Sequence, residues 1–322
     1  MNPRCLVCGS TEVAPKHEQL GDVIRRSSQV FAFYQCRSCR SLTAHPIPSA
    51  EELASYYPEH YTFRANTDAA GVQRVWQRLL WWGYPRWTYV SDVKTTVKLT
   101  QCRRGRLLDI GCGTGIQLRL FQQAGFDIEG MDLSPEDCAY TRRTLGCAVH
   151  EGTLDTVTLA PQQFDLLTLF NTLEHLPAPR AAIQRIATLL KPGGWVAIKI
   201  PVADGWEPAV FGKWWRNIRE IPRHLCLPST AGLRGLLQEY GFNQVRMASA
   251  SLMEQACMIG TTVYPWAIPY VNYASVRSPV LRAGNLLIGT ALTYASLPLA
   301  WCEAVTGKPS TVVIVAQRDP AS

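Results

Sequence analysis

Short apolar runs alternate with amphipathic segments along most of the chain. Leu107–Ile110 has the length of one buried strand, and Phe164–Phe170 is apolar almost throughout, as in a strand covered on both faces. Between such runs, apolar residues recur at helical spacing, as in Ile116–Phe121. Strands that alternate with helices predict a parallel sheet with helices on both faces. The other expected strands are Phe126–Met131, Ala148–His150, Trp195–Ile200, Val245–Ala250 and Thr311–Ala316.

The first of these strands leads into a glycine-rich turn, Gly111-Cys-Gly-Thr-Gly115, and a helical pattern follows at once. This is the layout of a nucleotide-type site, in which glycine lets a ligand approach the main chain. The spacing Asp109-x-Gly-x-Gly-x-Gly differs from the dinucleotide fingerprint, and the Lys-Ser or Lys-Thr of a P-loop is missing. Asp132 ends the next expected strand, where a carboxylate can accept hydrogen bonds from both hydroxyls of a ribose.

The stretch Leu107–Gly115 resembles motif I of the class I S-adenosylmethionine-dependent methyltransferases. The resemblance implies an α/β fold: a doubly wound, seven-stranded, mostly parallel Rossmann-like sheet with an antiparallel last strand. It implies S-adenosyl-L-methionine as cofactor, with its methionine part in the glycine loop and Asp109 near its amino group. The residues expected to border the cofactor are Asp109, Gly111, Cys112, Gly113, Gly115, Asp132, Leu133, Thr153, Leu154 and Asn171.

Three later segments extend this resemblance. Asn171–Leu176 is similar to the segment that passes between cofactor and substrate, and Lys191-Pro-Gly-Gly194 is similar to the family's turn before strand five. Pro222–Leu225 resembles a segment that closes over the substrate. His175 and His224 are candidate catalytic bases for a hydroxyl acceptor, because histidine titrates near neutral pH. A structural or substrate-orienting role is the alternative for each.

Two Cys-x-x-Cys pairs lie near the start of the sequence, with 27 residues between them. Four thiolates in two such pairs suit tetrahedral zinc and leave no open coordination position for catalysis. We therefore predict one structural Zn2+ held by Cys5, Cys8, Cys36 and Cys39, with redox-active cysteines as the alternative. This ribbon and the short helix after it, residues 1–62, resemble the amino-terminal module of bacterial methyltransferases that act on glycans or secondary metabolites.

Composition narrows the class of protein only partly. The 322 residues, 47% of them hydrophobic, are enough for one large domain with additions. A net charge of +7 is compatible with nucleic acid, an anionic membrane or an acidic substrate. The 11 cysteines favour a reduced protein over a disulfide framework. The sequence starts without an apolar leader, so we expect a cytoplasmic protein, with membrane association left open.

Two regions lie outside the regular α/β pattern. Residues 63–99 form an aromatic and arginine-rich linker with a helical pattern, and residues 100–322 form the methyltransferase domain with an apolar insertion at 251–309. Gln255–Val276 and Ala283–Cys302 contain no Asp, Glu, Lys or Arg. A cap over the active site, a contact with a second copy, a peripheral membrane contact through 255–302 and a membrane hairpin are the alternatives.

These features predict a methyltransferase that acts on a small molecule, a sugar or a lipid-linked glycan precursor. RNA methylation is a less favoured alternative, because the arginines are scattered among tryptophans rather than gathered in basic runs. A non-catalytic protein that binds S-adenosylmethionine is a further alternative, but it would be expected to have a damaged glycine loop or to lack Asp132.

Overall fold

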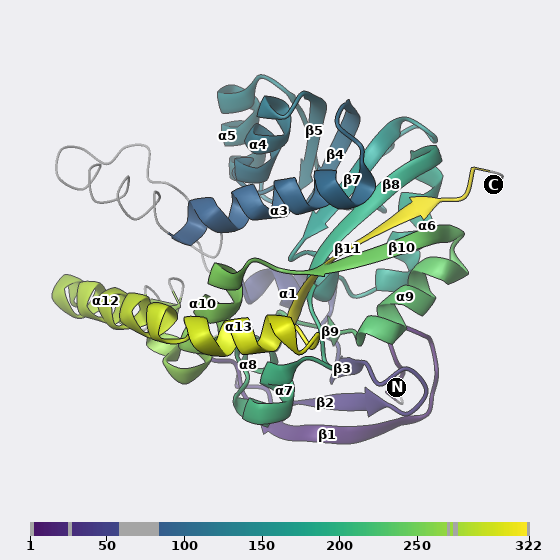
Figure 1. Ribbon diagram of the computed structural model, residues 1–322. Coiled ribbons are helices and arrows are strands. Elements are labelled where there is room, and N and C mark those ends of the chain that lie inside the picture. Colours follow the sequence, from purple (N-terminus) through teal and green to yellow (C-terminus); the bar gives the residue numbers. More distant parts are fainter. Residues whose placement is uncertain (1–2, 25–27, 58–83, 269–270, 273–275, 321–322) are drawn as a thin grey trace.

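The computed structural model describes residues 3–24, 28–57, 84–268, 271–272 and 276–320 (Figure 1). Most of the predicted linker helix, residues 63–83, therefore lies outside the described residues. From Tyr84 to Thr100 the chain is helical, as α3. The described residues contain two sheets, one of seven strands and one of four.

The seven-stranded sheet has the order β10-β11-β8-β7-β4-β5-β6. All its pairs are parallel except those of β11, which runs antiparallel to both β8 and β10. This confirms the predicted Rossmann-like methyltransferase fold. The strands are β4 (Gly105–Ile110), β5 (Phe126–Asp132), β6 (Ala148–Glu151), β7 (Phe164–Phe170), β8 (Leu190–Pro201), β10 (Phe242–Ser249) and β11 (Thr311–Arg318).

Strand β8 begins five residues before the predicted start at Trp195. Leu190 pairs with Phe164 and Trp195 with Leu166, so the four residues 191–194 of β8 lie opposite the single residue Asp165 of β7. The predicted Lys-Pro-Gly-Gly turn is therefore present as an irregularity within the strand. Gly193 accommodates it with a φ of 76°.

Alternate strand residues supply two hydrophobic cores, one on each face of the sheet. Leu107 packs into the core under α3, α4 and α5, whereas its neighbour Leu108 packs into the opposite core under α6 and α9. Figure 1 shows these two helical layers on either side of the sheet. Their bounds are α4 (Ile116–Gln123), α5 (Pro135–Leu145), α6 (Pro179–Leu189) and α9 (Thr230–Glu239).

The four-stranded sheet joins the cysteine-rich ribbon to a distant part of the chain. Strands β1 (Val13–Leu20), β2 (Phe31–Cys36) and β3 (Leu42–His45) come from the ribbon. The fourth, β9 (Cys226–Leu227), belongs to the long connection after β8 and pairs with β3. The other short elements are α1 (Ala50–Ser55), η1 (Leu173–His175), α7 (Trp206–Phe211), η2 (Gly212–Trp214) and α8 (Arg216–Arg219).

The insertion between β10 and β11 is helical. It contains α10 (Leu252–Val263), η3 (Pro265–Ala267), α12 (Pro279–Ala295) and α13 (Leu297–Val305). Helix α10 packs against α12 and α13 on one side and against α3 and α8 on the other. Among the helices of the described residues, none has the length and apolar character needed to cross a membrane.

Candidate functional site

The glycine loop lies at the carboxyl edge of the sheet, between β4 and α4. Gly111, Gly113 and Gly115 all have positive φ, at 78°, 49° and 72°. A Cβ atom on Gly111 would lie 2.5 Å from Oγ1 of Thr172, in the loop after the neighbouring strand β7. The loops after β4 and β7 therefore approach each other so closely that only glycine fits here.

Asp109 lies at the end of β4, beneath this loop, and is 2% exposed. Thr168 on β7 donates a hydrogen bond of 2.6 Å to Oδ1 of Asp109. The other carboxylate oxygen, Oδ2, is buried without a hydrogen-bond partner. Burial raises the pKa of Asp109 to about 7. A buried acceptor without a donor fits the expected place of an ammonium group, which would favour the ionised form.

Asp132 ends β5, the next strand of the sheet. One of its carboxylate oxygens accepts from the Gly113 amide at 2.8 Å and the other from the Ser134 amide at 2.9 Å. These contacts fix the carboxylate at the sheet edge. The next side chain, Leu133, is 69% exposed although it is apolar. A fixed acceptor beside an exposed apolar side chain fits the ribose and the base of a nucleoside.

The other residues expected at the cofactor site lie along the same edge. The amide of Gly152 donates to the carbonyl of Asp132 at 2.9 Å, which holds the loop with Thr153 and Leu154 beside β5. Asn171 is exposed at the end of β7 with a φ of 53°.

Cys112 differs from its neighbours in the loop. Its side chain is buried against Gly130, its amide donates to Met131, and its carbonyl accepts from Gly115. Both of its main-chain polar groups are thus used within the loop. We infer that Cys112 shapes the loop rather than binding a ligand with its side chain.

A second group of polar side chains faces this edge from η1 and the connection after β8. The rings of His175 and His224 meet edge to face, with centroids 4.8 Å apart. Nδ1 of His175 lies 2.9 Å from the carbonyl of Arg223 and 3.2 Å from the hydroxyl of Tyr57. Nδ1 of His224 lies 3.0 Å from the carbonyl of Asn217. Because a carbonyl only accepts, both Nδ1 atoms carry the proton and Nε2 is the basic nitrogen of each neutral ring.

Burial controls the protonation of this group. It lowers the pKa of His175 to about 4 and that of His224 to about 3, so both rings are neutral at pH 7. Burial raises the pKa of the adjacent Glu174 to about 8, and Oε2 of Glu174 has no hydrogen-bond partner. The sequence pattern singled out the two histidines but gave no signal for Tyr57, because its approach to His175 spans more than a hundred residues.

The segment that carries His224 is held by the ribbon. Arg223 is fully buried and forms an ion pair of 3.0 Å with Asp22, in the part of the ribbon after β1. The amide of Leu225 donates to the carbonyl of Glu174 at 2.8 Å. Residues 215–227 and the ribbon also share one hydrophobic core, which includes Phe33 and Trp215. Residues 211–228 thus link the ribbon to the edge of the sheet. We call them the lid segment.

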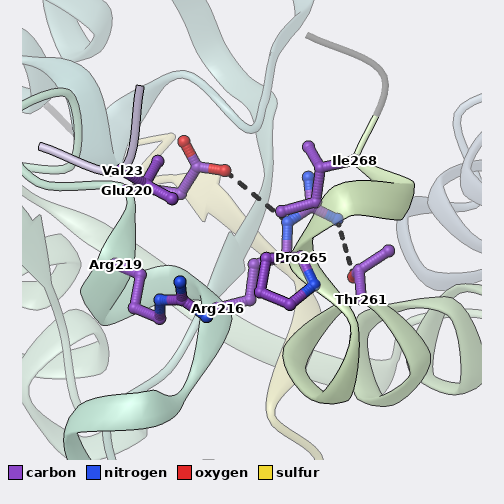
Figure 2. Close-up of a pocket in the computed structure, with 7 residues that line it drawn as sticks. All are labelled: Val23, Arg216, Arg219, Glu220, Thr261, Pro265 and Ile268. Carbon is purple, nitrogen blue, oxygen red and sulfur yellow. Dashed lines mark hydrogen bonds and ion pairs between the residues drawn. The ribbon is translucent and has the colours of Figure 1, made fainter. Parts of the chain in front are cut away.

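The lid segment also contacts the insertion. Figure 2 shows Arg216 between Glu220, its ion-pair partner at 3.6 Å, and Thr261 of α10, to which it donates at 3.2 Å. Val23 of the ribbon and Ile268 of the insertion line the same small cavity. Ribbon, lid segment and insertion therefore meet at one junction.

The four ribbon cysteines gather at one point. Sγ of Cys5 lies 3.5 Å from Sγ of Cys39, and the same distance separates Cys8 from Cys36. The amides of Cys8 and Cys39 each point to the sulfur three residues earlier, at 3.5 Å. Zinc–sulfur bonds of about 2.3 Å would place tetrahedral sulfurs about 3.8 Å apart, so this cluster fits a zinc ion. A hydrogen bond from Cys5 lowers the pKa of the Cys39 thiol to about 4.

Comparison with known proteins agrees with this geometry. Residues 88–246 match the model of a family described as "Methyltransferase domain". This match and the fold support a class I S-adenosylmethionine-dependent methyltransferase domain in this part of the chain. Among curated proteins, it is similar to the "Ubiquinone biosynthesis O-methyltransferase" of Bordetella avium, at 37% identity over 28% of this chain and 40% of that protein. The protein of that name from Pectobacterium carotovorum is 34% identical over 37% of this chain and 52% of its own length. The chain thus spans about half or less of these relatives.

The chain is also similar to solved structures. A Thermotoga maritima protein described as a "SAM-dependent methyltransferase, possible histamine N-methyltransferase" covers 76% of this methyltransferase and 96% of its own chain, with 18% identity and a TM-score of 0.47. CalS10, described as an amino pentose methyltransferase from Micromonospora echinaspora, covers 40% of this chain and 56% of its own, with 29% identity and a TM-score of 0.33.

Proposed function

We propose that this methyltransferase transfers a methyl group from S-adenosylmethionine to a nucleophile on a small-molecule acceptor. The observation that carries the proposal is one sheet edge that bears two groups of polar side chains. One group is Asp109 and Asp132 at the glycine loop, and the other is the pair His175 and His224 under the lid segment. The methyl donor and the acceptor would meet between these groups.

Polar atoms that can still accept hydrogen bonds indicate which residues would hold S-adenosylmethionine. Oδ2 of Asp109 would accept from the amino group, the lone pairs of Asp132 would accept from the ribose hydroxyls, and Leu133 would cover the base. Bound there, the cofactor supplies a methyl group that its sulfonium already activates. The protein then mainly orients the acceptor and keeps water away.

On the acceptor side, His175 and His224 are the groups that would handle the proton of a hydroxyl. Both are neutral, and each has an Nδ1–H held by a main-chain carbonyl, which leaves Nε2 to accept. Their lowered pKa values make them weak bases, which suits orienting the acceptor through a hydrogen bond from its hydroxyl more than removing its proton. Tyr57 would fix the ring of His175.

The enclosed position of these histidines favours a small acceptor such as a sugar, a lipid-linked glycan precursor or an aromatic hydroxyl compound. All nine residues from Ile221 to Ser229 are buried, so the lid segment closes this side of the site. The names of the curated relatives also refer to a small-molecule acceptor.

We also propose that the ribbon holds one structural zinc ion through Cys5, Cys8, Cys36 and Cys39. The zinc would fix the ribbon, and the ribbon would fix the lid segment through β3 and β9. Ser229, the first residue beyond the lid segment, adds a direct link because its hydroxyl donates to the carbonyl of Cys39 at 2.5 Å.

Methyl transfer from radiolabelled S-adenosylmethionine to fractionated cell extract tests the acceptor class. We expect label in the small-molecule or lipid fraction, and loss of this label with the double substitution His175→Asn and His224→Asn. Label recovered in RNA alone would contradict the proposed acceptor class. Binding of S-adenosylmethionine without label in any fraction would favour a non-catalytic role.

A further inference from the structure

The insertion has two parts with different environments. Helix α10 is the inner part, with seven of its residues buried between α3, α8, α12 and α13. Helices α12 and α13 are the outer part, in which only Gly289, Thr293, Ala300 and Glu303 are buried. Figure 1 shows α12 extending away from the central sheet. The inner helix can therefore serve as the cap predicted from the sequence, whereas the outer helices need another explanation.

The exposed side chains of the outer helices are large and apolar. Val280, Leu287 and Tyr294 are 80%, 72% and 53% exposed, and their spacing of seven residues places them on one face of α12. Surface of this kind marks an interaction site when it is contiguous. We use the name outer apolar surface for the exposed residues Val280, Leu281, Leu287, Ile288, Tyr294, Leu299, Trp301 and Val305.

The charges around this surface have one sign. From Gln255 to Arg318 the sequence has a single acidic residue, Glu303, and it is 1% exposed. Arg277, just before α12, and Lys308, just after α13, are both exposed. Basic side chains thus flank both ends of the outer apolar surface, while the exposed part of the insertion carries no described acidic group.

We propose that the outer apolar surface docks on an anionic membrane, with α12 and α13 lying in the plane of the lipid headgroups. Interfacial helices insert an apolar face to the depth of the acyl boundary and place basic side chains at the phosphates. Trp301 and Tyr294 suit the headgroup level, where aromatic side chains with a polar atom are enriched.

A second copy of the chain fits the same surface less well. In a symmetric dimer each outer apolar surface would face its own equivalent. Arg277 and Lys308 of both copies would then gather at the contact without an exposed acidic partner from the insertion. An anionic lipid surface supplies the missing negative charge.

Vesicle flotation with the full-length protein tests the proposal. We expect the protein to float with phosphatidylglycerol vesicles at low salt, to float less at high salt, and to bind phosphatidylcholine vesicles weakly. The variant Leu287→Glu with Trp301→Glu should lose binding by about tenfold or more, because it puts carboxylates into the docked face. Val30→Glu is the matched control, since Val30 is a 54% exposed apolar residue of the ribbon.

The binding of S-adenosylmethionine, measured by calorimetry, shows that each variant is folded and keeps this result separate from the proposed methyl transfer. The double variant Arg277→Glu and Lys308→Glu should float less with phosphatidylglycerol vesicles than the wild type does. Its flotation with phosphatidylcholine vesicles should be unchanged. The proposal is wrong if the wild type does not float with phosphatidylglycerol, or if the Leu287 and Trp301 variant floats equally well. A concentration-dependent dimer that this variant abolishes, without vesicle binding, would assign the surface to a second copy.

Discussion

At the scale of single residues, burial sets the protonation of the site. Burial raises the pKa of the Asp109 and Glu174 carboxyls, and it keeps the His175 and His224 rings neutral. Because Asp109 and His175 come near the ends of two expected strands, the sequence predicted both at one edge of the sheet. It did not predict the protonation of His175 and His224, which depends on the burial of both rings.

His224 makes this testable through the stability of the fold. The pKa of His224 is about 3 in the folded protein and about 6.5 in the unfolded chain. Between these two pH values the unfolded state binds more protons than the folded state, so the free energy of unfolding falls as the pH falls. In His224→Asn the side-chain amide replaces Nδ1–H and this dependence disappears. The stability advantage of the wild type should therefore shrink between pH 6.5 and pH 4, by at most about 1.4 kcal/mol per pH unit. Urea denaturation across this range measures it, and an advantage independent of pH would contradict the burial of a neutral ring.

At the scale of elements, strands and helices that follow from local sequence pattern could be predicted, whereas pairing between distant segments could not. The strands and helices around the glycine loop follow from apolar runs and turns, and Ser229 caps α9 by accepting a hydrogen bond from the Gly232 amide. The pairing of β9 with β3 joins Cys226 to Thr43, and β9 has only two residues. A strand this short has no periodic pattern, so it could not be recognised before the ribbon and the lid segment were seen together.

The ribbon depends on its metal site, and zinc analysis of Cys36→Ser tests this. We expect about one zinc per wild-type chain and much less in the variant, because a four-thiolate site loses one of its ligands. The ribbon of the variant should also be cut faster by protease. Cys302→Ser is the matched control, since Cys302 is an exposed cysteine of α13 that lies outside the four-thiolate cluster. Wild-type protein that is purified free of metal with a protease-resistant ribbon would rule out a structural zinc.

At the scale of the whole molecule, one buried lysine joins three regions that are far apart in sequence. Nζ of Lys199, on β8, lies 2.7 Å from Asp92 of α3 and 3.1 Å from Glu254 of α10. All three side chains are at most 2% exposed. The linker helix, the sheet and the insertion thus meet at one ionic cluster. The sequence could not predict this cluster, because no periodic pattern connects a lysine in an apolar strand with acidic residues in distant helices.

Replacement of Lys199 should destabilise the whole fold. Lys199→Met leaves two buried carboxyls without their cation, and breaking a buried pair from one side costs about 3–5 kcal/mol. The triple variant with Asp92→Leu and Glu254→Leu should recover much of this loss, because no charge remains buried. Chemical denaturation of the three proteins measures both effects. A single variant as stable as the wild type would show that the cluster does not hold these regions together.

We propose that S-adenosylmethionine binds at the edge formed by the glycine loop and Asp132. Calorimetric titration of the wild type and Asp132→Asn measures this binding. Hydrogen bonds to a charged group contribute about 1.5–3 kcal/mol, so the affinity of the variant should fall about tenfold or more. Asp127→Asn, an exposed change on the same strand, should bind as the wild type does. Equal affinities of the wild type and Asp132→Asn would contradict this account of the site.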